Sequence, residues 1–306
     1  MAKSSSIPGL RAASCSSVFA ASLVWLLLTH WSFLGLPYHW DELGYFVPAA
    51  YDLFTRGDLI PRSTPPNVHP PLVMAYVAAA WKLFGVSVPV TRLAMLLVAA
   101  CTLAATFLLG RQLAGSRTAL VTTALLAVSP PFVAQSMLVH LDLPAALWAL
   151  LAIYFYLADR WAPCAVAATA LALTKETGIL IPLILAVFAL ASRRPPWFLI
   201  PPLVALGAWL VFLHASTGFW LGNAEFERYN VDQAAQLTRI PLVFLRRIYQ
   251  LAFANFHWIA VLALRRSGRI PHRGLLAALI SGYLLLHSIL GGAILLALQI
   301  CDQARG

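Results

Sequence analysis

Charged side chains are scarce in this sequence. Asp, Glu, Lys and Arg together make up only 10% of its 306 residues, while hydrophobic residues make up 61% and the mean hydropathy is +0.80. Because a soluble domain is typically only about 45–50% apolar, this composition excludes an ordinary soluble domain. It favours a protein embedded in a membrane.

Cysteine pairs and metal-ligand spacings are also lacking. The four cysteines lie far apart and none forms a CxxC pattern, so they are interpreted as small buried hydrophobes at Cys15, Cys101, Cys164 and Cys301. We assign no metal site and predict no cofactor, because the nearest candidate ligands are too loosely spaced to define a geometry; they are His39, Asp41, His69 and His140. A divalent metal stays open as an alternative.

The formal charge of +10 raises the question of a nucleic-acid partner. No basic patch interleaved with aromatic residues is present, which argues against nucleic acid. In a membrane protein an excess of Lys and Arg instead encodes orientation. Membrane lipids are therefore the predicted surroundings.

Ten apolar runs recur along the chain, at about 15–36, 71–84, 91–109, 118–133, 143–158, 163–173, 177–191, 197–213, 248–264 and 274–300. Runs of this kind must be helical in lipid, because lipid offers backbone groups no other partners. The first is interpreted as a retained signal anchor. Run 71–84 is too short for the roughly 20 residues of a span, so we expect it to lie in the interface. The prediction is an all-α polytopic membrane helix bundle of about nine spans.

The distribution of basic residues tests this topology. If the N-terminus lies inside and 71–84 does not cross, the inner segments 1–14, 110–117, 158–163, 192–196 and 265–273 hold 11 of the 21 basic residues and only one acid, Asp159. A crossing at 71–84 would place the later Arg-rich loops outside, against the positive-inside rule. We therefore expect one transmembrane domain over 1–306 in a cell inner membrane, with a cytoplasmic tail at 1–14 and large outer loops at 37–90 and 214–248.

Polar and ionisable side chains recur at the outer ends of consecutive predicted spans. They are Asp41, Glu42, Tyr45, His69, Arg92, His140, Asp142, Lys175 and Glu176. Such groups are costly at a membrane edge unless they are paired or functional, so their recurrence predicts a polar cavity at the outer surface. Each also has a plainer interpretation.

The plainer interpretations are local. Asp41 is placed to cap a helix over 43–55, with Glu42 favoured by the helix dipole. His69 lies at the start of the interfacial helix, where the chain changes direction into the membrane surface. Arg92 either snorkels to the interface or meets a lipid phosphate, and Lys175 either pairs locally with Glu176 or points into the cavity.

The chain also resembles the GT-C class of membrane glycosyltransferases, in the protein O-mannosyltransferase and aminoarabinose-transferase-like (PMT-2) branch. The resemblance covers residues from about 15 to 190, and residues beyond 200 match only by hydropathy. The elements that carry it, in order, are Asp41-Glu42-x-x-Tyr45, His69-Pro70-Pro71-Leu72, Lys82-Leu83-Phe84-Gly85, Thr91-Arg92-Leu93, Gly110-Arg111-Gln112-Leu113-Ala114-Gly115 and Leu141-Asp142.

This resemblance implies transfer of a sugar from a polyprenyl-phosphate donor to a lipid, glycan or protein acceptor on the extracytoplasmic side. It implies that Asp41 is the catalytic base with Glu42 supporting it, and that Asp142 helps to position substrate or base. Arg92 and Lys175 would contact phosphate, and the remaining substrate-binding residues would be Tyr45, His69, His140 and Glu176. A single base without a covalent nucleophile implies inversion. Relatives usually continue for several more spans, so the C-terminal part of the family is expected to be absent.

Two rival functions make different predictions. A lipid or small-molecule transporter or flippase would place charged or Gly/Pro-broken sites near the mid-bilayer and would carry inverted repeats. A non-catalytic homologue would keep the fold but block Asp41 from the cavity. The polar residues cluster at span ends, which favours the glycosyltransferase.

Overall fold

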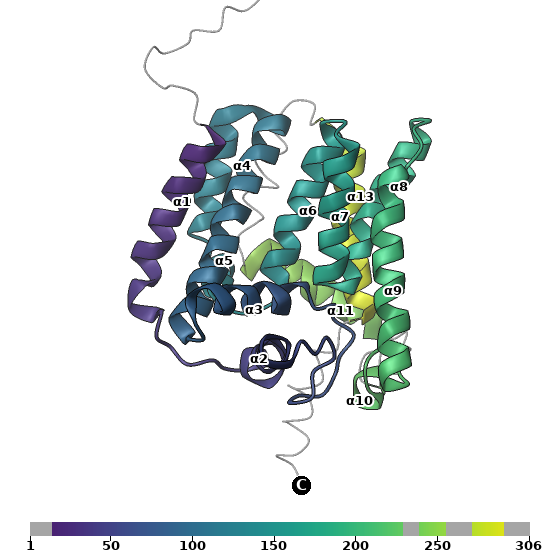
Figure 1. Ribbon diagram of the computed structural model, residues 1–306. Helices are drawn as coiled ribbons and strands as arrows, with labels where there is room; N and C mark the ends of the chain where they lie inside the picture. The colour runs from purple at the N-terminus through teal and green to yellow at the C-terminus, as the bar shows by residue number, and fades with distance from the viewer. Residues whose placement is uncertain (1–13, 229–238, 255–270, 291–306) are drawn as a thin grey trace, which may run out of the picture.

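The chain folds into a bundle of long helices with shorter elements packed across one end (Figure 1). The computed structural model describes residues 14–228, 239–254 and 271–290, and these contain helices and no strand. The prediction of an all-α fold is therefore confirmed. The predicted span over 248–264 lies mostly outside the described residues, so the number of spans stays a prediction.

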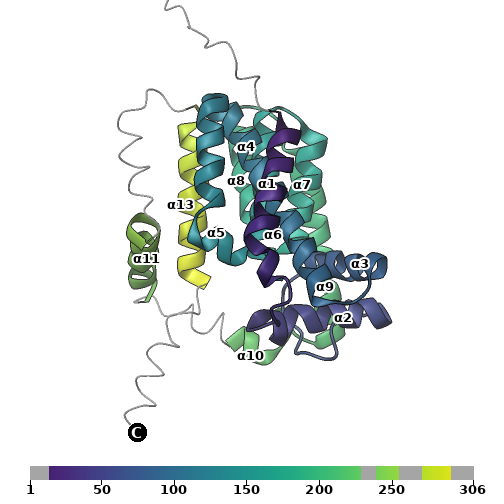
Figure 2. The same cartoon turned by 90° about the vertical axis from the view of Figure 1, so that its left-hand side faces the viewer.

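The long helices run side by side along one axis (Figures 1 and 2). They are α1 (Cys15–His30), α4 (Val88–Ala127), α6 (Asp142–Leu157), α7 (Trp161–Thr174), α8 (Leu180–Ala191), α9 (Ile200–Thr217) and α13 (Arg273–Leu290). Within residues 14–228, 239–254 and 271–290, three stretches are long and apolar enough to cross a membrane by length and composition, namely Cys15–Phe33, Val88–Ala127 and Trp197–Thr217. This is the architecture of a polytopic membrane bundle.

Helix α4 contains a reversal of the chain. Gly115 adopts φ 83° and ψ 167° within it, a conformation that glycine reaches without the steric cost of a Cβ. A Cβ on Gly110 would lie 3.2 Å from the Cα of Ala119, whereas nine residues of straight helix would separate them by about 13 Å. The predicted turn over 110–117, between two apolar runs, is therefore confirmed.

Two short helices lie across the lower end of the bundle as drawn in Figure 1, α2 (Val47–Arg56) and α3 (Leu72–Phe84). They pack on each other around Phe46, Val77 and Trp81, which are almost completely buried. Figure 2 shows both running across the bundle axis. Helix α3 thus does not run through the bundle, which agrees with the prediction for run 71–84.

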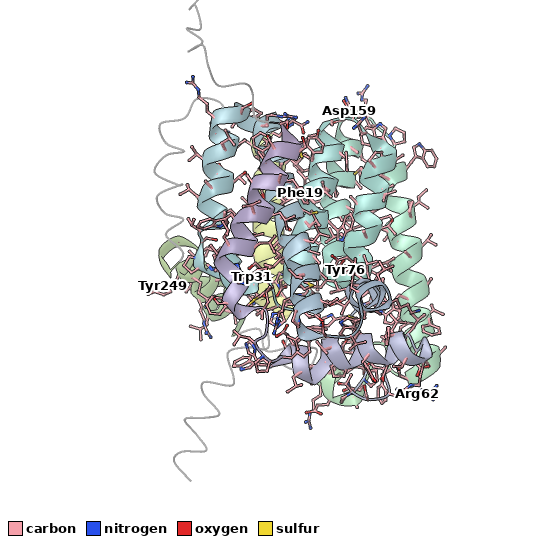
Figure 3. All side chains as sticks on the ribbon, turned by 60° about the vertical axis from the view of Figure 1, so that its left-hand side comes forward. Phe19, Trp31, Arg62, Tyr76, Asp159 and Tyr249 are labelled. Atoms are coloured by element: carbon pink, nitrogen blue, oxygen red, sulfur yellow. The ribbon has the colours of Figure 1, made fainter. Side chains whose placement is uncertain are left out.

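The remaining elements complete the two ends. Short turns or helices are η1 (Trp31–Phe33), η2 (Glu42–Phe46), α5 (Pro130–Gln135), η3 (Glu176–Ile179), η4 (Trp197–Leu199) and α10 (Ala224–Glu227). Helix α11 (Arg239–Tyr249) is followed by η6 (Gln250–Ala254) and packs beside α13. Figure 3 labels Asp159 at the upper end and Arg62 at the lower end, so the predicted inner and outer loops lie at opposite ends.

Candidate functional site

A cavity of about 620 Å³ opens at the lower end of the bundle, and we call it the outer cavity. It is lined by Asp41, Tyr45, Phe46, Pro65, Asn67, Val68, His69, Lys175, Glu176, Thr177, Leu221, Asn223, Glu225, Phe226 and His287. Five of the nine predicted site residues are among them. The structure therefore joins the first loop, the turn between α7 and α8, the segment after α9 and helix α13.

Asp41 stands on an unusual backbone. Trp40, immediately before it, has φ 53°, a left-handed conformation that costs a residue with a Cβ about 1–3 kcal/mol. Glu42–Phe46, immediately after it, form a π-helical turn, a feature often found at functional sites. The Asp41 side chain is exposed and makes no capping hydrogen bond. Asp41 does precede the first helical residue, Glu42, but the capping interpretation was wrong because its side chain accepts no hydrogen bond from that first turn.

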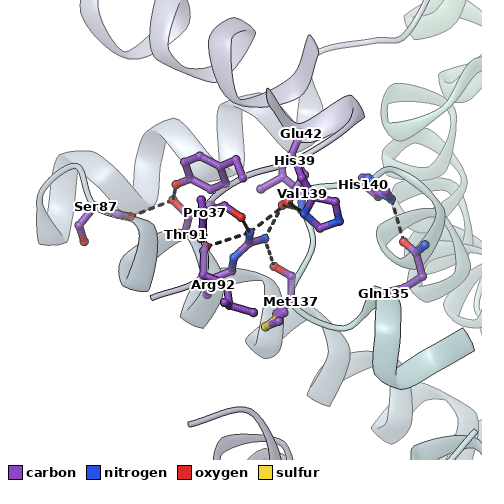
Figure 4. Close-up of polar contacts among 12 residues, drawn as sticks. Pro37, His39, Glu42, Ser87, Thr91, Arg92, Gln135, Met137, Val139 and His140 are labelled. Carbon is purple, nitrogen blue, oxygen red and sulfur yellow. Dashed lines mark hydrogen bonds and ion pairs between the residues drawn. The ribbon is translucent and has the colours of Figure 1, made fainter. Parts of the chain in front are cut away.

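Glu42 and Arg92 form a buried ion pair, which we call the Glu42–Arg92 clasp (Figure 4). The two side chains are 0% and 1% exposed, and the carboxylate meets both terminal nitrogens of the guanidinium, one of them at 3.0 Å. The Val139 N–H donates to Glu42 at 2.7 Å, while Arg92 donates to the carbonyls of Met137 and Pro37 at 2.9 and 3.2 Å. The clasp thus ties three chain segments together beside Asp41.

This position decides between two interpretations of Arg92. The side chain points into the protein, so it does not snorkel to the surface. Both terminal nitrogens already donate within the protein. A contact with a lipid phosphate would require the clasp to open, so the geometry favours a role in holding the Asp41 segment.

His69 and Glu176 form a second pair across the outer cavity wall. The His69 Nδ1 lies 2.8 Å from the Glu176 Oε2, and both side chains are about one-fifth exposed, at 18% and 19%. The ring of His69 also packs against Phe46 and Phe226, with centroid distances of 6.2 and 5.8 Å. The pair connects the start of α3 to the turn after α7.

Lys175 pairs with Asp142 rather than with its neighbour Glu176. The Lys175 Nζ lies 2.7 Å from the Asp142 Oδ1. Burial alone would lower the pKa of the Lys175 ammonium, but the charge and hydrogen bond of Asp142 outweigh burial and raise that pKa. The ammonium lines the outer cavity, and Asp142 is its counter-ion just outside the lining.

His140 lies behind the cavity wall. Its Nδ1 is 2.9 Å from the Gln135 Oε1 and its ring meets Phe46 edge-on at 6.1 Å. It is therefore one layer removed from the space that His69 faces. Glu42, Arg92, His140 and Asp142 all support the cavity from outside its lining.

The segment after α9 contributes residues that the sequence did not single out. Gly222 has φ +96°, and a Cβ there would lie 2.7 Å from the backbone of Asn67. The Asn223 side-chain amide donates to the Pro66 carbonyl at 2.5 Å. Through these contacts, residues 218–226 pack against the loop before α3 and form one side of the outer cavity.

Of these additional lining residues, only His287 carried a usable signal. It is an ionisable side chain inside an otherwise apolar run, which is uncommon in a span. Thr177, Asn223 and Glu225 stand in ordinary turn sequence and give no such signal. Among the described residues, no group of three or more His, Cys, Asp or Glu side chains could hold a metal ion.

Comparison with known proteins points to one family. Residues 68–220, half of the chain, match the model of the dolichyl-phosphate-mannose-protein mannosyltransferase family. Two crystal structures of ArnT from Cupriavidus metallidurans have a similar fold, each at 20% sequence identity. The structure bound to undecaprenyl phosphate has a TM-score of 0.63, covering 89% of this chain and 55% of ArnT. The apo structure has a TM-score of 0.53, covering 90% and 60%.

The chain therefore spans little more than half the length of these solved relatives. No curated protein matches it.

Proposed function

The chain belongs to the dolichyl-phosphate-mannose-protein mannosyltransferase family, and we propose that it transfers a sugar from a polyprenyl-phosphate donor to an acceptor. The ArnT-like fold supports this proposal, since one ArnT structure holds undecaprenyl phosphate. The observation that carries it is a cavity where the carboxylate of Asp41 has no protein partner within the described part of the chain, while the Lys175 ammonium lies on the cavity wall.

Asp41 is the base in this proposal. A carboxylate without a cationic partner is free to accept a proton, whereas those of Glu42 and Glu176 are already held. Asp41 removes the proton of an acceptor hydroxyl or amine, and the freed lone pair attacks the anomeric carbon. The bond from that carbon to the phosphate oxygen breaks in the same displacement, so the configuration inverts.

Lys175 stabilises the departing phosphate. Its ammonium has three donors and Asp142 occupies one at 2.7 Å, which leaves donors for the oxygen that gains charge in the transition state. Asp142 positions Lys175 in this scheme, and the Glu42–Arg92 clasp positions Asp41. Tyr45, His69 and Glu176 line the space left for substrate, with His140 behind them.

The charge distribution of the loops supports an extracytoplasmic location for this site. The turn with Arg193 and Arg194 lies at the upper end, because Arg194 pairs with Asp159, which Figure 3 labels there, and the lower end carries the outer cavity. By the positive-inside rule the lower end faces away from the cytoplasm. A lipid-linked donor would present its headgroup there.

The test is an Asp41→Asn variant in membranes supplied with polyprenyl-phosphate sugars, with products identified by mass spectrometry. We expect the transfer rate to fall about 10²–10⁴-fold, the usual contribution of a general base, while folding is kept. The matched control is Asp159→Asn, an exposed acid at the opposite end that should leave transfer unchanged. Transfer by Asp41→Asn at the wild-type rate would refute the assignment, and lipid movement without a sugar product would favour a transporter.

A further inference from the structure

The His69–Glu176 pair has a defined arrangement of hydrogen-bond donors and acceptors. Burial opposes ionisation of the Glu176 carboxyl, but the interaction with His69 outweighs burial and holds the pKa of that carboxyl below its ordinary value. An ionised carboxylate only accepts, so the shared proton at 2.8 Å lies on the His69 Nδ1. A neutral imidazole carries one proton. Its Nε2 is then an acceptor, because the partner of Nδ1 sets the tautomer.

The His69 ring is also fixed in place. The His69 backbone N–H donates to the Asn67 Oδ1 at 3.0 Å, and Phe226 meets the ring edge-on at an interplanar angle of 88°. Phe46 covers the ring from another side at 43°. With Glu176 on Nδ1, Nε2 is the ring nitrogen without a protein partner among the described residues, and His69 lines the cavity.

The charges around the pair disfavour an anion at this position. His69 is paired with a carboxylate, and two further carboxylates, Asp41 and Glu225, line the same cavity. An anionic ligand prefers uncompensated cations and several donors. A hydroxyl group, which can donate to Nε2, needs neither.

We propose that His69, with its tautomer set by Glu176, binds a substrate hydroxyl through Nε2 and does not bind the donor phosphate. This rests on the proposed function, since the hydroxyl belongs to the sugar of the donor or to the acceptor. His69 is then a specificity-determining residue that selects for a hydroxyl at one position. Lys175 remains the contact for phosphate.

The tautomer can be observed directly. In the full chain labelled with ¹⁵N-histidine and reconstituted in nanodiscs at pH about 8, we expect His69 to carry its proton only on Nδ1. His69→Gln identifies the resonance. Glu176→Gln, whose amide can either donate or accept, should give a mixture of tautomers. A wild-type protein with the proton on Nε2 would overturn the proposal.

Ligand binding separates hydroxyl from phosphate without requiring turnover. Undecaprenyl phosphate alone should leave the Nε2 resonance in place, and undecaprenyl-phosphate mannose or methyl mannoside should shift it. A shift with only methyl mannoside would place the hydroxyl on the acceptor side, and a shift with only the lipid-linked sugar would place it on the donor. A shift with undecaprenyl phosphate alone, or with none of the three, contradicts the proposal.

Substitution gives a second readout. His69→Gln keeps an acceptor, whereas His69→Lys supplies only donors and a charge. We expect His69→Lys to raise the KM of sugar transfer about 10-fold or more, with a smaller rise for His69→Gln, and neither to tighten undecaprenyl phosphate binding. Tighter lipid phosphate binding by His69→Lys would show an anion site. Absence of transfer by the wild-type protein would refute the proposed function, while the resonance of His69 would still test this inference.

Discussion

Breaking the Glu42–Arg92 clasp should destabilise the protein more than any exposed ion pair does. We consider Arg92→Met, which keeps the length and most of the volume of the side chain. It leaves the Glu42 carboxylate, which is 0% exposed, with the Val139 N–H as its hydrogen-bond donor. It also removes the guanidinium donors from the carbonyls of Met137 and Pro37.

The expected cost is about 3–5 kcal/mol, because removing one partner of a buried pair leaves an uncompensated charge. Glu42→Gln also leaves a buried charge, on Arg92, but it should cost less because the guanidinium keeps two backbone carbonyls as acceptors and the new amide oxygen still accepts from Val139. The double variant Glu42→Gln/Arg92→Met removes both charges together. Its cost should therefore fall short of the sum of the single costs by about 2 kcal/mol or more, within the range of coupling between residues in contact.

The assay is a double-mutant cycle of unfolding free energies in mixed detergent micelles, followed by tryptophan fluorescence. The matched control is Arg194→Met, which breaks the pair with Asp159 at the opposite end, where the side chains are 52% and 58% exposed. Exposed pairs contribute about 0–1 kcal/mol. An Arg92→Met cost no larger than that of Arg194→Met, or additive single costs, would refute the view that the clasp is a coupled unit holding Asp41.

Two further stability predictions concern helix α2 and the segment after α9. Burial opposes ionisation of Asp52, but the backbone N–H groups of Ser63 and Arg62 and the Ser63 hydroxyl outweigh it, with the Arg56 charge, and hold the Asp52 pKa below its ordinary value. Asp52→Asn should therefore lower the free energy of unfolding by about 2–4 kcal/mol near neutral pH. The difference from wild type should shrink as pH falls below about 4, because a carboxyl with a lowered pKa in the folded state stabilises the protein only while it is ionised. An unchanged difference at low pH would contradict this. Gly222→Ala should destabilise the protein by about 1–3 kcal/mol or more, seen as a lower melting temperature, because its φ is +96° and the new Cβ would lie 2.7 Å from the Asn67 backbone. The control Gly207→Ala, in a helix with open space around it, should be neutral or stabilising.

Hydropathy and charge predicted the fold well because lipid imposes few choices. The helices, the reversal near Gly115 and the crosswise position of α3 all follow from run length and from the need to satisfy backbone groups. The start of α2 was not predictable in this way. A π-helical turn over Glu42–Phe46 depends on tertiary contacts of Glu42, which local propensity does not include.

The candidate site was predicted as a set of residues but not as a set of partners. Lys175 and Glu176 are neighbours in sequence, yet one pairs with Asp142 and the other with His69. Pairings of this kind join residues 33 and 107 positions apart. These pairs depend on how the helices pack against one another, and the periodicity of the sequence does not predict helix packing.

The pattern of ion pairs indicates which carboxylate is available to act as the catalytic base. The carboxylates of Glu42, Asp142 and Glu176 are each already held by a cation or a histidine. Asp41 and Glu225 line the outer cavity without such a partner among the described residues. Glu225 lies on the four-residue helix α10, whereas the backbone next to Asp41 is anchored by the buried clasp. Because a base must be held in a fixed position to act on a bound hydroxyl, the structure favours Asp41 over Glu225 for that role.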